Sequence, residues 1–240
     1  MKDETIEAQR TADAFRQTDV TAVQAVTGRH SIRQFRPDPV DAAVVREILA
    51  GASRAPSGTN TQPWKVRVAM GAARDRVSDA VLAAAEAGEH DEEYAYSPKP
   101  LKEPFLARRR AVGYALYNLY GIARDDYPGR KAAALRNYAF FGAPVGLFFS
   151  MDRELLYGSW LDVGMFMQNV MVLARAHGLE TCPQQAWCEY AAAVRGALGV
   201  PEEEILISGM AMGHADWTAP QNSLVSEREP VDGFATFLTA

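Results

Sequence analysis

The chain is poor in cysteine and histidine, with two cysteines and four histidines among its 240 residues. Cys182 and Cys188 have neither the spacing of a zinc-binding pair nor that of a redox C-x-x-C motif. His177 is near them in sequence, but such scattered ligand types do not predict a metal site. We expect two thiols in the core or in a loop, and a reducing cytoplasm suits them.

Long hydrophobic runs and an excess of positive charge are also missing. No run of about 18 apolar residues occurs, so we expect no contact with a membrane through a spanning helix. Met1 to Glu4 lack the apolar stretch of a secretory signal. The net charge of -5 argues against a general nucleic-acid partner, because such binders are basic. With 48% hydrophobic and 23% charged residues, the sequence is typical of a globular protein with one sizeable core.

Several common catalytic motifs are absent. The sequence contains no G-x-S-x-G, no H-E-x-x-H and no Walker loop, and it lacks the G-x-G-x-x-G fingerprint of a dinucleotide-binding domain. No protein nucleophile or pair of acids stands out. We therefore expect no catalytic side chain of these kinds.

Hydrophobic periodicity predicts strands among helices, which is typical of an α+β domain. No linker, repeat or low-complexity segment divides residues 1–240, so we expect a single domain. Residues 1–20 are interpreted as an N-terminal arm, 217–240 as a tail, and 88–104 as a long loop of the kind that often forms a lid. Helices are expected at 20–28, 41–52, 72–87, 105–124, 158–177 and 190–199, strands at 64–70, 143–151 and 205–212, and a short segment at 180–187.

The helix expected at 158–177 carries an apolar stripe with helical spacing. We interpret this stripe as a core or subunit-interface surface rather than a ligand contact. Its members are Leu161, Met165, Gln168, Asn169 and Val172.

A short basic motif, R-x-S-x-R, occupies residues 29–33. In an extended segment, Arg29, Ser31 and Arg33 share one face. Two guanidinium groups and a hydroxyl on one face can bind phosphate, because the planar donors of arginine match phosphate oxygens. The alternative is a solvated surface stretch, which is the common origin of such triplets.

A second motif, the loop Ala55–Trp64, reads A-P-S-G-T-N-T-Q-P-W. Its Ser57, Asn60 and Gln62 can hydrogen-bond the polar edge of a flat ring. The alternative is a simple turn between a helix and a strand. A phosphate-binding face followed by this loop favours a phosphorylated heterocycle as ligand.

Together the two motifs resemble the nitroreductase family of FMN-dependent oxidoreductases, and the resemblance covers roughly residues 20–235. The region 89–139 and the segment Phe140–Pro144 look most like the nitrobenzoate-reductase-like branch. The resemblance implies a central, mostly antiparallel sheet wrapped by helices. It also implies a homodimer formed through the long helix, with the tail embracing the partner.

The resemblance further implies a set of FMN-binding residues. Arg29, Ser31 and Arg228 would hold the phosphate, and Arg33 would lie near N1 and O2 of the ring. The family often has a second basic residue where this chain has Ser226, which is a departure. The backbone amides of Gln185 and Ala186 would reach flavin N5 and O4. The full set is Arg29, His30, Ser31, Arg33, Pro56, Ser57, Gly58, Asn60, Gln62, Gln185, Ala186 and Arg228.

The activity that the resemblance implies is ping-pong transfer of electrons from NADPH or NADH, through flavin N5, to a nitroaromatic or quinone-like acceptor. Tyr94, Tyr96 and Phe105 are the candidates for contact with this small aromatic acceptor. The alternatives are a reductive dehalogenase or a flavin-fragmenting enzyme of the same superfamily, and a non-enzymatic flavin-storage or sensor protein.

Overall fold

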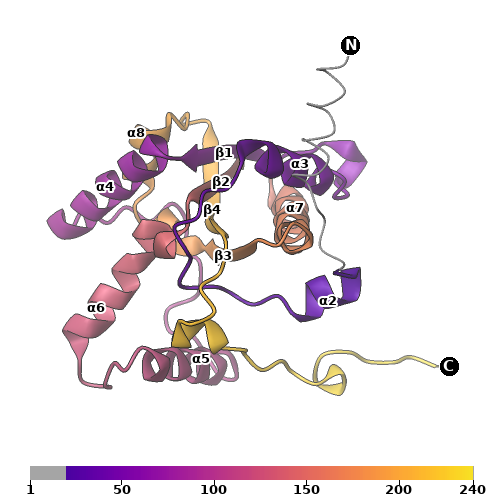
Figure 1. Cartoon of the computed structure of the whole chain (residues 1–240). Helices are drawn as coiled ribbons and strands as arrows, with labels where there is room; N and C mark the ends of the chain where they lie inside the picture. The colour runs from indigo at the N-terminus through magenta and orange to yellow at the C-terminus, as the bar shows by residue number, and fades with distance from the viewer. Residues whose placement is uncertain (1–19, 240) are drawn as a thin grey trace, which may run out of the picture.

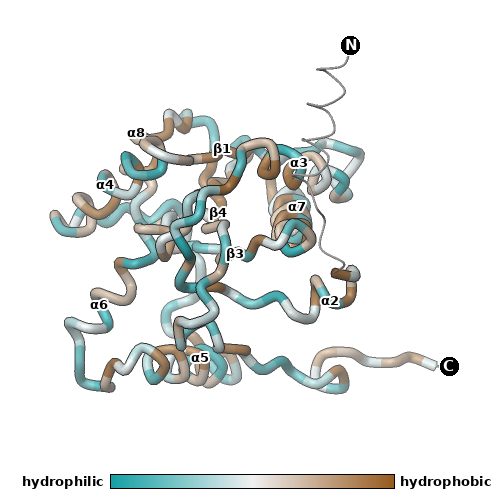
Figure 2. The backbone as a smooth tube through the Cα atoms, in the orientation of Figure 1, coloured by the Kyte–Doolittle hydropathy of each residue, from teal (hydrophilic) through white to brown (hydrophobic). Residues whose placement is uncertain are grey.

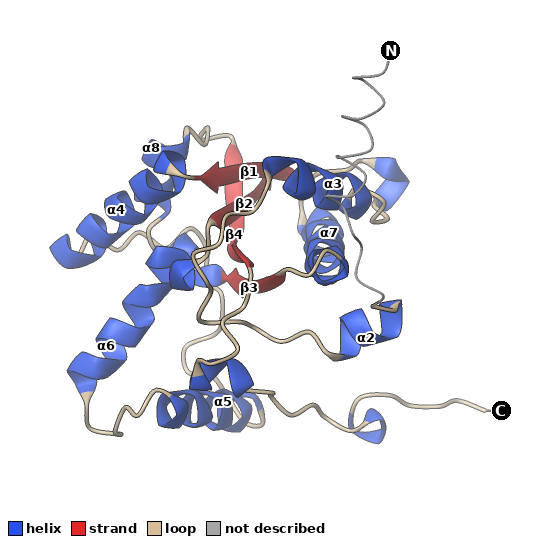
Figure 3. Cartoon of the chain, viewed as in Figure 1, coloured by secondary structure: helices blue, strands red, loops and turns tan. Residues whose placement is uncertain are grey.

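The computed structural model describes residues 20–239, so the predicted N-terminal arm lies, except for Val20, outside the described residues. Within them, four strands form one sheet in the order β1-β2-β4-β3 (Figures 1 and 3). Every neighbouring pair is antiparallel, which confirms the expected type of sheet. The strands are β1 (Lys65–Met70), β2 (Val145–Asp152), β3 (Glu180–Gln184) and β4 (Glu204–Gly213).

Six helices of the described part coincide with helices expected from the sequence, and none of its helices is long and apolar enough to cross a membrane. A further helix, α6, was not predicted, because Pro128 and Gly129 in its first turn suggest a loop. Proline is compatible with the start of a helix, and Asp126 caps α6 by accepting a hydrogen bond from the Gly129 N–H (2.9 Å). The helices are α2 (Ala22–Thr27), α3 (Ala42–Ala52), α4 (Ala72–Ala87), α5 (Phe105–Leu119), α6 (Tyr127–Leu135), α7 (Tyr157–Ala176) and α8 (Ala191–Leu198).

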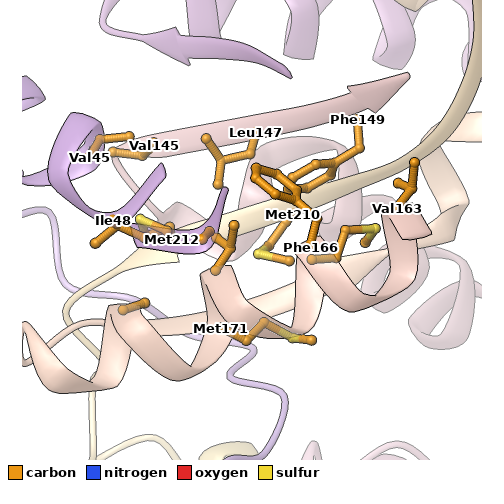
Figure 4. Packing of buried hydrophobic residues seen from close by; sticks show 14 of the residues in the cluster. Val45, Ile48, Val145, Leu147, Phe149, Val163, Phe166, Met171, Met210 and Met212 are labelled. Atoms are coloured by element: carbon orange, nitrogen blue, oxygen red, sulfur yellow. The ribbon is translucent and has the colours of Figure 1, made fainter. Parts of the chain in front are cut away.

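One face of the sheet packs against α3 and α7. Alternate residues of β2, namely Val145, Leu147 and Phe149, point to this side and pack with Ile48 and Phe166 (Figure 4). The register aligns Val145 with Met212 of β4, which continues the same apolar layer. α7 therefore lies against the sheet along the middle of the molecule.

The opposite face packs against α4, α8 and short 3-10 turns. Phe148 of β2 points to this side, where it meets the fully buried Phe140 and Trp187. Both faces of the sheet are thus covered by helices, as expected. The same layer contains Cys182 and Cys188, which are buried free thiols.

The apolar stripe predicted on α7 does not lie in the core of the chain. Leu161 is 71% exposed and Met165 is 39% exposed. The buried face is instead formed by residues such as Val163, Phe166 and Val170. The core alternative is therefore wrong for Leu161 and Met165, which leaves the subunit-interface alternative of the same prediction. The tail also exposes hydrophobic residues near its end, where Figure 2 is brown.

Candidate active site

The R-x-S-x-R segment runs beside strand β3 in extended form. The Ile32 N–H donates to the Thr181 carbonyl (3.1 Å), and the Ile32 side chain is fully buried. Arg29, Ser31 and Arg33 flank it and are only half-buried. Ile32 is the one buried residue of 29–34, because His30 and Gln34 are half-buried as well, so the shared face of Arg29, Ser31 and Arg33 stays a prediction.

The electrostatic influence of this segment reaches one buried thiol. Burial raises the pKa of Cys182, while the charge of Arg33, a hydrogen bond with Ser31 and the charge of Arg29 act in the opposite direction.

The C-terminal tail brings a second guanidinium to Arg29. Burial lowers the pKa of Arg29, and the nearby positive charge of Arg228 lowers it further. The Arg29 side chain donates no hydrogen bond to any residue from 20 to 239, so its donors are available to an anion. Arg228 is held by Ser226, whose hydroxyl and carbonyl accept from its Nη1 (2.7 and 2.9 Å). Ser226, which occupies the position where the family often has a second basic residue, thus orients Arg228.

One carboxylate lies beside this cationic cluster. Glu180 accepts a hydrogen bond from Arg175 Nε (3.0 Å). Burial raises the pKa of Glu180, while Arg175, His30 and Arg29 oppose the increase. A single carboxylate cannot balance three or more nearby cations, so the site favours a ligand group with more than one negative charge. The terminal phosphate of FMN fits this donor set.

The loop Ala55–Trp64 is anchored to α7 rather than to the R-x-S-x-R segment. The Gly58 N–H donates to Oδ2 of Asp162 (3.2 Å), a buried residue of α7. Ser57 Oγ accepts from the Gln62 N–H (3.0 Å). Asn60 and Gln62 have left-handed backbone conformations, with φ of 62° and 47°, which amide side chains near turns can tolerate. Asp162 was missed in the sequence, because a lone acidic residue in an apolar helix carries no motif.

The two motifs lie on different sides of α7. In Figure 1 the loop after α3 lies above α7, whereas the segment after α2 passes below it towards β3. One chain therefore does not bring Pro56, Ser57, Gly58, Asn60 and Gln62 together with the phosphate-binding face.

Gln185 and Ala186 begin a 3-10 turn, η3 (Gln185–Glu189), directly after β3. The first amides of such a turn have no acceptor within it, so they can donate to a ligand. The Gln185 side chain is held on two sides. Its Oε1 accepts from Ser208 Oγ (2.9 Å), and its Nε2 donates to the Tyr94 hydroxyl (2.9 Å).

The three aromatic residues proposed for the acceptor have different surroundings. The Tyr94 hydroxyl donates to the Ile207 carbonyl (2.6 Å), and its ring packs edge-to-face on Trp160 (4.8 Å). Burial raises the pKa of Tyr94. Tyr96 and Phe105 are 71% and 57% exposed. Tyr94 is thus part of the packing around Gln185, whereas the other two are accessible to an acceptor.

A sheet wrapped by helices, with two arginines near each other at its edge, is compatible with the class of proteins that bind a phosphorylated cofactor. The chain belongs to the nitroreductase family, whose model matches residues 26–214. This confirms the resemblance deduced from the two motifs.

Characterised relatives match most of the chain. It is 37% identical over 215 residues to a chloronitrobenzene nitroreductase of Comamonas testosteroni, covering 89% of this chain and 95% of that protein. It is 36% identical over 213 residues to a 4-nitrobenzoate reductase of Pseudomonas putida, covering 89% and 93%. Among solved structures, the FMN- and NADPH-dependent nitroreductase NfnB of Sphingopyxis sp. strain HMH has a TM-score of 0.89 and 43% identity, covering 92% of this chain and all of that one.

Proposed function

We propose that this protein is an FMN-dependent oxidoreductase that takes electrons from NADPH or NADH and reduces nitroaromatic acceptors. The observation that carries the proposal is the match of the nitroreductase family model to residues 26–214, together with Arg29 and Arg228 lying near enough for their charges to interact. Relatives named for chloronitrobenzene and 4-nitrobenzoate support the choice of acceptor class.

The residues of the chain have separate tasks in this proposal. Bound FMN supplies the hydride-accepting and hydride-donating chemistry. Arg29, Ser31 and Arg228 bind its phosphate through charge-assisted hydrogen bonds. Arg33 is a fixed cation on the same face and would stabilise negative charge on the ring. The amides of Gln185 and Ala186 are the donors proposed for the N5 side.

We also propose that the active form is a homodimer with two shared sites. The Ala55–Trp64 loop lies on the other side of α7 from the phosphate-binding face, so the loop of a second copy would complete each site. The exposed apolar residues of α7 support this arrangement, because a monomer rarely leaves such a patch in water. They are Tyr157, Leu161 and Met165, and the N-cap residue Leu156 is exposed beside them.

The acceptor would lie over the exposed ring face, near Tyr96 and Phe105 and beneath the loop at 88–104. The two free thiols support a reducing compartment such as the cytoplasm.

Stopped-flow mixing of the flavin-loaded protein with NADPH, and separately with NADH, tests the proposal. Rapid bleaching of the flavin, followed by reoxidation with a nitroaromatic, is the expected result. A flavin that stays oxidised with both nicotinamides would instead support a storage or sensor protein. In a parallel titration, equal affinity for FMN and riboflavin would contradict the phosphate assignment.

A further inference from the structure

Asn222 connects the tail to the R-x-S-x-R segment. It lies in a short 3-10 turn of the tail and is 1% exposed. Its Oδ1 accepts from the Arg33 N–H (2.7 Å), and its Nδ2 donates to the Gln34 carbonyl (2.7 Å). Its own carbonyl contacts His30 Nε2 (2.9 Å). One buried residue therefore holds this segment at two backbone atoms and at the His30 side chain.

The same side chain also fixes the tail itself. Nδ2 donates a second hydrogen bond to the Asp216 carbonyl (2.8 Å), and the Asn222 N–H donates to the Ala219 carbonyl (3.0 Å). The turn closed in this way lies six positions before Arg228. The path of the tail towards Arg29 therefore begins at a fixed point.

We propose that Asn222 is a positioning residue for the phosphate of FMN. It holds residues 30–34 so that Ser31 and Arg33 face the ligand, and it starts the path along which Arg228 reaches Arg29. Asn222 itself does not touch the phosphate in this scheme. The inference rests on the proposed function, because it assumes that this face binds the FMN phosphate.

The chemistry of the contacts explains why an amide is needed. Asn222 accepts on one side and donates twice on the other, and only an amide side chain offers both. An ionised aspartate has almost the same shape but would place an oxygen against the Gln34 and Asp216 carbonyls. Alanine would leave the buried Arg33 N–H unpaired, which is costly. Both changes therefore disturb backbone atoms next to the phosphate-binding side chains.

The test compares FMN with riboflavin, which has the same ring but no phosphate. The affinities of the ligand-free protein for both flavins are measured by fluorescence titration, in the parent and in the Asn222→Asp and Asn222→Ala variants. We expect about 10- to 100-fold weaker FMN binding and a smaller loss for riboflavin, because Arg33 faces the ring that both flavins share whereas Ser31 and Arg228 act on the phosphate alone. Gln221→Ala is the matched control. Gln221 is a buried amide next in sequence, and its side chain has no hydrogen bond to residues 29–34 within the described part.

A double variant separates positioning from a general structural role. If Asn222 acts through the phosphate-binding face, adding Asn222→Ala to Arg29→Ala should weaken FMN binding by less than about threefold more. Equal losses for FMN and riboflavin in the single variants would overturn the inference. Loss of cooperative unfolding in both single variants would also overturn the inference, and so would an unchanged FMN affinity in either variant. If the parent itself does not prefer FMN to riboflavin, the proposed function fails. If the parent prefers FMN and the Asn222 variants keep that preference, only this inference fails.

Discussion

Replacing Arg29 by alanine is expected to remove most of the thermal stabilisation that FMN binding gives, without lowering the stability of the ligand-free protein. The Arg29 side chain has no hydrogen bond to other described residues, so the substitution breaks no hydrogen bond within the described part of the chain. Burial and the charge of Arg228 lower its pKa, which means that the folded protein disfavours the charged guanidinium. The melting temperature of the ligand-free variant should therefore equal or exceed that of the parent.

The magnitude with FMN follows from binding linkage. At a concentration 100 times the parent's Kd, FMN stabilises the parent by about 2.7 kcal/mol. Loss of charge-assisted hydrogen bonds of about 1.5–3 kcal/mol weakens binding by about 10- to 150-fold. At the same FMN concentration the variant gains only about 0.3–1.4 kcal/mol. For a chain of this size the parent should shift by about 5–10 °C, and the variant by at most about half of that.

Differential scanning fluorimetry or calorimetry at one protein concentration, with and without FMN, measures both effects. Arg36→Ala is the matched control, because Arg36 is an exposed arginine of the same region that forms a surface ion pair with Asp38 (2.9 Å). The control should keep the full FMN shift. A ligand-free Arg29→Ala protein that melts several degrees below the parent would show that Arg29 is structural. An unchanged FMN shift would refute its role in phosphate binding.

Three further predictions concern acid stability, assembly and the acceptor. Burial alone would raise the pKa of Glu204, but hydrogen bonds from Arg67 and Ser150 and nearby positive charges outweigh it and lower the pKa from 4.5 to about 2. The pKa of Glu204 is lower in the folded than in the unfolded protein. The free energy of unfolding of the parent should therefore decrease by about 3 kcal/mol as pH falls from about 4.5 to about 2. In urea unfolding, the free energy of unfolding of the Glu204→Gln variant should depend less on pH over this interval and should be lower than that of the parent at pH 7. Leu161→Asp should weaken dimerisation at least about tenfold, as measured by sedimentation; a parent that is a stable, flavin-loaded monomer at micromolar concentration would contradict the shared site. Tyr96→Ala and Phe105→Ala should each raise the acceptor KM about 2- to 10-fold by loss of aromatic contact while stopped-flow flavin reduction stays normal, and unchanged acceptor kinetics in both would exclude them from the pocket.

Much of the fold was predictable because local signals agree with the tertiary structure. Asp41 caps α3 as expected, with its side chain accepting from the Ala43 N–H (2.8 Å). The α7 stripe shows the limit of periodicity, which reports that a face is apolar but not what covers it. In this chain Leu161 faces away from the core, and Phe166 faces into it.

The candidate site was predictable only where side chains follow a short motif. Arg29, Ser31 and Arg33 were predicted to share a face because an extended backbone imposes it. Asn222 could not be assigned from its surroundings in the sequence, because its partner Arg33 lies 189 positions away. The burial of Asn222 and the orientation of its side-chain amide are defined only when the tail is folded against residues 30–34.

The loop at 88–104 shows how anchoring limits a proposed lid. Glu93 is almost fully buried and forms ion pairs with Arg153 (2.6 Å) and Arg195 (2.8 Å), and the Tyr94 hydroxyl bonds to the Ile207 carbonyl (2.6 Å). Opening the loop at these two residues would remove both arginine partners from the buried Glu93 carboxylate, which is strongly unfavourable. Any movement that admits an acceptor should therefore begin after Tyr94. Tyr94 would then keep Gln185 in place while Tyr96 moves, so the donors proposed for the flavin stay fixed during exchange of the nicotinamide and the acceptor.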